Sequence, residues 1–421
     1  MTFSTLATLA LALLADLSQA TPAGAIERRQ LKFPFGQEKV RGVNLGGLFV
    51  LEPWITPSIF EATPENVVDE YTFCETLGKD EAKRRLEEHW STFYTEEDFA
   101  LMKQYGLNTV RVPIGYWAVA PLEGDPYVQG AYEHLPDIVQ WAGNNGLTVM
   151  IDLHGAPLSQ NGFDNSGKRG PVGWTQGDSV QQTRNALDRI RDDYANNPTV
   201  SSIELLNEPM GPQLDMNVVR QFYYDGWGSL RDSPVAVVFH DAFMGVTSWN
   251  EFGAGMQNLV LDTHHYEVFS SGELQMSPGQ HISTACGFGA QMASTNKWTI
   301  AGEWSGAQTD CAKYLNGRGI GARYDGTFNK DGQGSSYIGS CDRKTSGSVD
   351  GLSGDEKNNI KQFIAAQIAA YEKAAGWIFW CWKNEAAPEW HFRDLVAGGL
   401  VPQPLDSQRE FDVCCSDLIL Y

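Results

Sequence analysis

The chain has 421 residues, enough for one large domain or two ordinary ones, and its 42% hydrophobic and 20% charged residues are typical of a globular protein. Its 52 acidic residues outnumber its 31 basic ones, which gives a formal net charge of −21. This charge argues against binding to nucleic acid or to an anionic membrane surface, because both require basic side chains that neutralise phosphate. It suits a neutral ligand.

The N-terminus carries the pattern of a secretory leader. Residues 6–17 are apolar but too few to span a bilayer, and Ser18 and Ala20 stand at the −3 and −1 positions of a cleavage site. We expect residues 1–20 to be a signal peptide, residues 21–29 a propeptide that ends at the dibasic pair Arg28-Arg29, and residues 30–421 a single domain. No other stretch is long and apolar enough to cross a bilayer, so the sequence predicts a secreted protein.

Short β-rich runs recur along the chain, and several are almost continuously apolar, as expected for parallel strands buried on both faces. They are Val40–Leu45, Leu107–Ile114, Leu147–His154, Val200–Glu208, Val235–His240, Leu259–Tyr266, Trp298–Trp304 and Trp377–Trp382. Helical patterns lie between some of them, including Glu81–Trp90 and Gly354–Gly376, the second closed by its glycine. This alternation predicts an α/β fold, a (β/α)8 TIM barrel with long loops on its active face.

A doubly wound open sheet is the alternative. Such a sheet usually carries a glycine-rich phosphate-binding turn after its first strand. The residues at that position, RGVNLGGLFVLEP, space their glycines differently and give no helix signal. The sequence therefore favours the barrel.

Polar side chains gather at the C-terminal ends of the predicted strands, which form the active face of a barrel. They include Asn44, Arg111, Asp152, His154, Asn207, Glu208, His240, His264, Tyr266 and Glu303, with Trp380 on the last strand. A purely structural barrel would not need so many polar residues on one rim. The pattern predicts a functional site there.

Glu208 and Glu303 each stand at the end of an apolar strand, in IELLNEP and WTIAGEW. Two carboxylates across a cleft are suited to glycoside hydrolysis, in which one protonates the leaving oxygen and the other attacks the sugar or activates water. These roles predict a raised pKa for Glu208 and a low pKa for Glu303. The fixed charge of Arg111 would hold Glu303 ionised.

Other catalytic chemistries have less support. The histidines lack zinc-site spacing, since there is no H-E-x-x-H motif and the adjacent His264 and His265 point to opposite faces of a strand. A serine nucleophile would need a G-x-S-x-G turn, which the chain does not contain. We therefore expect no metal and no other cofactor.

Several motifs together resemble a known family. They are RGVNLGGLFVLEPW, LNTVRVPIGYW, IDLHGAPLSQNGFDNSG, LLNEP, HHYEVFS, AGEWS and GWIFWCWKNEAAPEW. Over about residues 33–412 the chain is similar to the fungal exo-β-1,3-glucanases, or glucan 1,3-β-glucosidases, of glycoside hydrolase family 5. The resemblance implies a (β/α)8 barrel with Glu208 as acid/base and Glu303 as nucleophile.

The resemblance also implies how the substrate is held. Around the sugar at the cleavage site it places Arg111, His154, Asn207, His264, Tyr266 and Trp380, with further sugar contacts from Glu52 and Asn165. Phe163 and Phe269 match an aromatic pair that grips the next sugar. One departure is Leu48, which stands where the family usually has tryptophan.

The chain has seven cysteines, which in a secreted protein indicate disulfides. The family's two bridges would map onto Cys286–Cys414 and Cys311–Cys341, although the adjacent Cys415 leaves the partner of Cys286 open. Cys381 lies on an apolar strand, so we expect it to be an unreactive buried thiol.

Residues and resemblance together predict a secreted, monomeric, retaining exo-β-1,3-glucanase that releases glucose from the ends of β-1,3-glucan chains, outside the cell or in the cell wall. Its partner would be a β-glucan polysaccharide or oligosaccharide, and its balance between hydrolysis and transglycosylation stays open. Long segments at residues 52–71 and 155–174 are predicted to wall a closed pocket. The alternatives are an endo-acting β-1,6- or β-1,4-glucanase on the same barrel, or a barrel that only binds glucan, which would not need both glutamates.

Overall fold

A computed structural model describes residues 31–406 and Cys414, and these residues belong to one compact unit. The expected signal peptide and propeptide, and Cys415, lie outside the described residues. Among the described residues, no helix is both long and apolar enough to cross a membrane.

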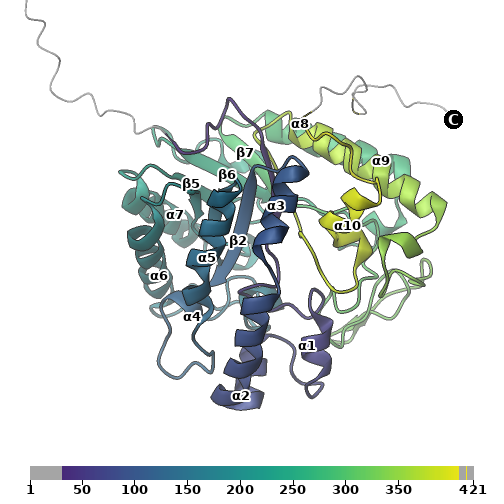
Figure 1. Ribbon diagram of the computed structural model, residues 1–421, viewed down its shortest axis with the longest axis horizontal. Helices are drawn as coiled ribbons and strands as arrows, with labels where there is room; N and C mark the ends of the chain where they lie inside the picture. The colour runs from purple at the N-terminus through teal and green to yellow at the C-terminus, as the bar shows by residue number, and fades with distance from the viewer. Residues whose placement is uncertain (1–30, 407–413, 415–421) are drawn as a thin grey trace, which may run out of the picture. The chain divides into compact units, whose positions relative to one another are not determined.

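Parallel strands close into an eight-stranded barrel with the neighbour order β1-β10-β7-β6-β5-β4-β3-β2, surrounded by helices (Figure 1). The strands are β1 (Val40–Asn44), β2 (Thr109–Gly115), β3 (Thr148–Gly155), β4 (Val200–Glu204), β5 (Ala236–His240), β6 (Leu259–His264), β7 (Trp298–Glu303) and β10 (Gly376–Phe379). Each barrel strand lies within a predicted run or within a residue or two of it. The predicted barrel is confirmed.

Helices follow most of the strands. They are α1 (Pro57–Glu61), α2 (Glu70–Thr92), α3 (Glu96–Gln104), α4 (Tyr116–Val119), α5 (Ala131–Asn144), α6 (Ser179–Tyr194), α7 (Met216–Leu230), α8 (Pro278–Ala293), α9 (Gly354–Tyr371) and α10 (Phe392–Ala397). The helix predicted over 81–90 is the second half of α2. The prediction that Gly376 closes the other helix is wrong: α9 ends at Tyr371, and Gly376 begins β10. A Cβ at Gly376 would lie 2.1 Å from the carbonyl oxygen of Val40, so this close strand pairing requires glycine.

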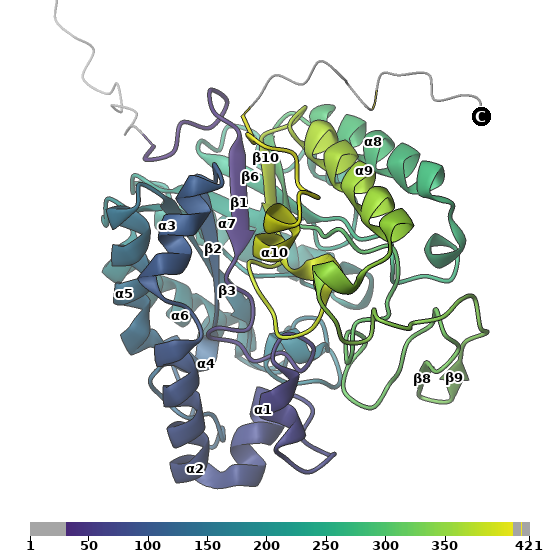
Figure 2. The ribbon, with the colours of Figure 1, turned by 45° about the vertical axis from the view of Figure 1, so that its right-hand side comes forward.

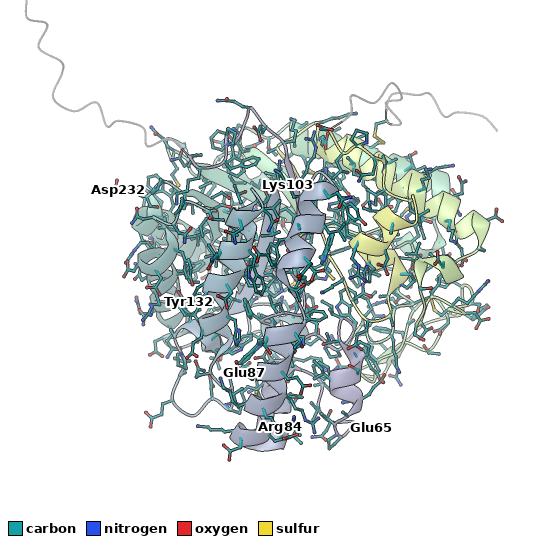
Figure 3. The ribbon with its side chains drawn as sticks, in the orientation of Figure 1. Glu65, Arg84, Glu87, Lys103, Tyr132 and Asp232 are labelled. Carbon is teal, nitrogen blue, oxygen red and sulfur yellow. A yellow bond between two sulfur atoms is a disulfide. The ribbon has the colours of Figure 1, made fainter. Side chains whose placement is uncertain are left out.

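The long helix α2 shows how local sequence sets the outer layer. Asp69 and Thr72 form a capping box that fixes its start. Ala82, Leu86 and Trp90 recur at helical spacing and are buried against the core. Charged side chains such as Arg84 and Glu87 lie on its outer surface (Figure 3).

The barrel interior changes from apolar to polar along the strands. Met150, Val238, Val260, Ile300 and Ile378 belong to one buried apolar cluster. Side chains two residues apart on a strand share a face, so the residue two positions after each of these also points into the barrel. On three strands that residue is polar. These positions are Asp152 on β3, His240 on β5 and Asp262 on β6, all fully buried. The apolar layer thus supports a layer of charged groups towards the C-terminal ends of the strands.

Two disulfides pair Cys286 with Cys414 and Cys311 with Cys341, as the family resemblance implied. The second closes the segment after β7, which carries the short hairpin of β8 (Asn329–Lys330) and β9 (Gln333–Gly334) (Figure 2). Cys381 is buried and unpaired, as predicted. Burial raises the pKa of its thiol, which keeps it protonated.

Candidate active site

A cavity of about 380 Å³ opens at the C-terminal ends of the strands. Its lining comes from the segments after β1, β3, β4, β5, β6, β7 and β10, and it includes Glu52, Phe163, Asn165, Glu208, Tyr266, Phe269, Glu303 and Trp380. The side chains of Phe163 and Phe269 are 37% and 42% exposed, although both are large and apolar. Parts of the long segments after β1 and β3 line the cavity, and that they close one end of it stays a prediction.

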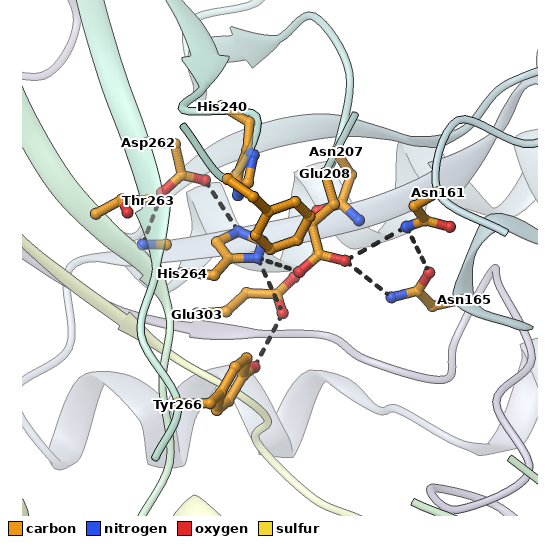
Figure 4. Close-up of polar contacts among 12 residues, drawn as sticks. Asn161, Asn165, Asn207, Glu208, His240, Asp262, Thr263, His264, Tyr266 and Glu303 are labelled. Carbon is orange, nitrogen blue, oxygen red and sulfur yellow. Dashed lines mark hydrogen bonds and ion pairs between the residues drawn. The ribbon is translucent and has the colours of Figure 1, made fainter. Parts of the chain in front are cut away.

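The imidazole of His264 contacts the carboxylates of both Glu208 and Glu303 (Figure 4). The Nδ1 atom of His264 lies 2.7 Å from Oε1 of Glu208 and 3.4 Å from Oε2 of Glu303. Because one atom contacts both carboxylates, these two oxygens lie no further apart than the sum of the two distances, about 6 Å. This bound on one pair of oxygens is compatible with the separation of about 5–5.5 Å between the carboxyl groups of retaining glycosidases.

Glu303 is held at both of its oxygens. Arg111 donates from Nη1 to Oε1 at 3.0 Å, and the Tyr266 hydroxyl donates to Oε2 at 2.9 Å. Arg111 is fully buried and also contacts Glu204 at 2.8 Å and Asp152 at 3.1 Å. A single guanidinium thus lies among three carboxylates, and its rigid fork fixes the orientation of Glu303.

The second carboxylate oxygen of Glu208 contacts neutral side-chain amides. The side-chain amides of Asn165 and Asn161 lie 3.2 and 3.4 Å from Oε2, and Asn161 also donates to Asn165 (Figure 4). Neutral amides stabilise a carboxylate less than a guanidinium does, and they also accommodate a protonated carboxyl group. The contact with Glu208 places Asn165 beside that carboxyl group in the cavity lining.

The pKa shifts of Glu208 and Glu303 run opposite to the prediction. Burial raises the pKa of Glu208, but the hydrogen bond and the charge of His264 outweigh it and leave that pKa below its ordinary value. Burial raises the pKa of Glu303, and His264 and Arg111 do not offset burial and the charge of Glu208. The prediction is wrong because His264 lies closer to Glu208 than to Glu303, so Glu208 has the stronger stabilisation as an anion.

Some residues that the resemblance placed around the sugar do not line the cavity. Arg111, His154, Asn207 and His264 are buried directly beneath it. His154 donates to or accepts from Asp152 at 2.6 Å, its ring lies parallel to that of Trp380, and Arg111 donates to Asn207 at 2.8 Å. In this structure these side chains support Glu303, Glu208 and Trp380 from below.

Comparison with known proteins agrees with this geometry. Residues 74–318 match the model of the cellulase family, glycosyl hydrolase family 5. The chain belongs to glycoside hydrolase family 5. It is 53% identical over 408 residues to the glucan 1,3-beta-glucosidase of Blumeria graminis, covering 95% of each chain. It is 52% identical over 384 residues to the probable glucan 1,3-beta-glucosidase A of Emericella nidulans, covering 90% of this chain and 93% of that one.

A solved structure shares the fold. The rutinosidase from Aspergillus niger superimposes with a TM-score of 0.67 at 18% identity, covering 86% of this chain and 98% of that chain. This likeness concerns the barrel alone. Family membership identifies the protein as a glycoside hydrolase.

Sequence reasoning missed several residues of this family 5 site. Phe243, after β5, lines the cavity and is 39% exposed, and Asn161 contacts Glu208. Arg323 and Phe328 reach the cavity from the segment between Cys311 and Cys341, where the guanidinium lies 4.0 Å from the ring centroid. Phe243 could have been noticed, because it is an aromatic three residues after a strand end. The positions of Asn161, Arg323 and Phe328 could not be predicted, because they depend on how their loops fold over the cavity.

Among the residues that the structure describes, two groups of side chains are close enough to hold a metal ion: Glu208 with His240 and His264, and Glu204 with Asp262 and His264. His264 is common to both. Its two ring nitrogens already contact carboxylates, Nδ1 at Glu208 and Nε2 at Asp262. These two contacts with carboxylates involve both ring nitrogens, so hydrogen bonding accounts for the closeness of both groups.

Proposed function

We propose that this family 5 enzyme is a retaining exo-β-1,3-glucanase that releases glucose from the ends of β-1,3-glucan chains. The observation that carries the proposal is the shared contact of Glu208 and Glu303 with His264 beneath a walled cavity. The names of the fungal relatives supply the linkage. Secretion is part of the proposal, and the two disulfides are consistent with an oxidising compartment.

In the proposed first step, Glu303 attacks the anomeric carbon while Glu208 protonates the glycosidic oxygen, which breaks the bond to the departing chain. A glucosyl ester on Glu303 results. In the second step Glu208 takes a proton from water, which attacks the anomeric carbon and releases Glu303. Arg111 and Tyr266 stabilise the carboxylate of Glu303 both as it approaches and as it leaves.

The first sugar would lie against Trp380, with Glu52 and Asn165 within reach of its hydroxyl groups. Glu52 accepts from the Trp54 indole at 3.0 Å, and its other oxygen has no hydrogen-bond partner among the described residues. Burial raises the pKa of Glu52 well above its ordinary value, followed by the charges of Asp164 and Glu303. A protonated Glu52 is therefore available to donate to a sugar hydroxyl in the cavity.

The second sugar would lie between Phe163 and Phe269, whose exposed faces flank the cavity. The ring of Phe269 packs edge-on against the ring of Tyr266, with ring centroids 5.6 Å apart. This contact fixes the orientation of the Phe269 ring. Aromatic faces bind the C–H surfaces of sugars without fixing hydroxyl positions. This arrangement suits a chain end that must advance by one sugar after each cleavage.

Digestion of laminarin tests the proposal. We expect glucose to be the main product from the first minutes, with little early loss of viscosity, and NMR of fresh product to show the β-anomer. A rapid fall in viscosity with longer oligosaccharides would instead support the endo-acting alternative, and early α-glucose would contradict retention. We also propose that the enzyme acts as a monomer at or near the cell wall, and that high oligosaccharide concentrations reveal any transglycosylation as longer products.

A further inference from the structure

Asp262 lies behind the site, on β6, and is fully buried. Its Oδ1 accepts the backbone N–H of Gly302 at 2.7 Å, and its Oδ2 lies 3.3 Å from Nε2 of His264 (Figure 4). A Cβ at Gly302 would lie 2.2 Å from this carboxylate. The residue before Glu303 is therefore a glycine because Asp262 fills the space that a side chain would need.

His264 has a carboxylate at each ring nitrogen. Nε2 meets Asp262, and Nδ1 meets Glu208 at 2.7 Å and Glu303 at 3.4 Å. A neutral imidazole has one N–H and one lone pair, so one of its nitrogens would face a carboxylate with a lone pair. Only the imidazolium donates at both nitrogens.

We propose that Asp262 is a positioning residue that keeps His264 as an imidazolium shared by Glu208 and Glu303, so that this one charge decides which carboxyl group holds the proton. The proposal rests on the roles assigned to the two glutamates in the proposed function. When His264 donates to Glu208, as its 2.7 Å contact indicates, that carboxylate is stabilised as an anion. When it donates to Glu303 instead, Glu208 is left with its amide contacts and takes up the proton that acid catalysis needs.

The charges around His264 support this assignment. Groups beside it on other strands are Glu208 and Glu204 after and on β4, Glu303 on β7, and His240 and Asp241 at the end of β5. Arg111 on β2 contacts Glu303 and Glu204, and it also contacts Asp152 on β3, which pairs with His154. Burial lowers the pKa of His264, yet Glu303, Asp262 and the hydrogen bond to Glu208 raise it well above its ordinary value. Burial lowers the pKa of the neighbouring His240, followed by the charges of His264 and Arg111, so that ring stays neutral.

The Asp262→Asn variant tests the charge of His264 while keeping the hydrogen bonds that position its ring. The amide oxygen still accepts from Gly302, while the amide nitrogen donates to Nε2 of His264 and leaves its proton on Nδ1. The hydrogen bond to Glu208 is kept, but the positive charge is lost. Because removing a nearby cation raises the pKa of a carboxyl group, we expect both limbs of the kcat/KM pH profile to move to higher pH, by about one unit or more.

Glu267→Gln is the matched control. Glu267 contacts His281 at 2.7 Å, and this buried carboxylate–histidine pair is outside the cavity lining. We expect this variant to lose stability while both limbs stay at their wild-type positions. A folded Asp262→Asn enzyme with lower kcat but unmoved limbs would overturn the proposal.

The charge of His264 can be measured without activity. In protein labelled with ¹⁵N-histidine, the two ring nitrogens of an imidazolium have nearly the same chemical shift, whereas those of a neutral ring differ widely. We expect nearly equal shifts for wild-type His264 at neutral pH and widely different shifts in Asp262→Asn. The signals are assigned to His264 by their loss in His264→Gln. A neutral His264 in the wild type would overturn the proposal. Failure to cleave laminarin would contradict only the proposed function, since the spectrum still decides the charge.

Discussion

The Tyr266 hydroxyl and the Glu303 carboxylate are joined by a hydrogen bond of 2.9 Å, made to the oxygen that Arg111 does not contact. Tyr266 lies two residues beyond the end of β6, and Glu303 is the last residue of β7. The adjacent strands thus place a neutral donor on the cavity side of Glu303, while the charged donor lies beneath it. This division leaves one face of Glu303 open to substrate.

Tyr266→Phe should lower kcat/KM on laminari-oligosaccharides by about 10- to 100-fold, because a hydrogen bond to a charged group contributes about 1.5–3 kcal/mol. The loss should appear mainly in kcat. Tyr337→Phe is the control, since that tyrosine is 68% exposed and does not line the cavity. An unchanged kcat/KM for Tyr266→Phe would show that Arg111 alone orients Glu303.

Glu208→Gln should lower turnover of laminari-oligosaccharides by about 100- to 10,000-fold, the range for loss of a general acid. An aryl glucoside with an acidic phenol departs without protonation, so its first step should be much less affected. Burst kinetics with the two substrates would separate these effects. Glu303→Gln should lose activity on both, and equal losses on both substrates for Glu208→Gln would contradict its assignment as the acid.

Phe163→Ala should weaken binding of oligosaccharides through loss of one face of the aromatic pair, which contributes about 1 kcal/mol, or about fivefold in kcat/KM. Aryl glucosides, which lack the second glucose, should be affected less. Leu158→Ala is a matched control, because Leu158 is in the same segment, is 54% exposed and does not line this cavity. Comparable losses on both substrate types would place Phe163 elsewhere in binding.

Replacing Cys311 and Cys341 with serine should lower the free energy of unfolding by about 3–4 kcal/mol, since that bridge spans 30 residues. Calorimetry under non-reducing conditions measures the change. Because Arg323 and Phe328 lie within the bridged segment, kcat/KM on longer oligosaccharides should fall further than on aryl glucosides. Cys381→Ala should leave both disulfides intact, which peptide mapping would check.

Asp164 should make stability depend on pH. Burial raises the pKa of this cavity-lining carboxyl from an ordinary value of 3.8 to about 7, against the opposing charge of Arg169. Because its folded pKa is raised, its contribution is fully present below about pH 4 and is lost as pH rises through about 7. Asp164→Asn should therefore gain about 4 kcal/mol relative to wild type between pH 4 and 8. Parallel stability curves for the two proteins would contradict this.

Much of the architecture could be read from local patterns. Apolar runs such as IELLNEP and WTIAGEW mark parallel strands because both faces of such strands are buried, and the C-terminal ends of barrel strands meet on one face. Glu208 and Glu303 could therefore be paired although they are far apart in the chain. The end of α9 could not be predicted, because Gly376 is needed for contact with Val40, a residue distant in sequence.

The sequence alone determined the barrel, the two glutamates and the clustering of polar residues around them. These features depend on the alternation of side chains along each strand and on the C-terminal ends of the strands meeting on one face. Only the tertiary structure decided which carboxylate is stabilised as an anion, since this depends on His264 lying 2.7 Å from Glu208 and 3.4 Å from Glu303. It also decided that Arg111 and Asn207 lie beneath the cavity and that Phe243 lines it. Electrostatic stabilisation in a buried site changes over fractions of an ångström, and those distances are set by the packing of several strands together.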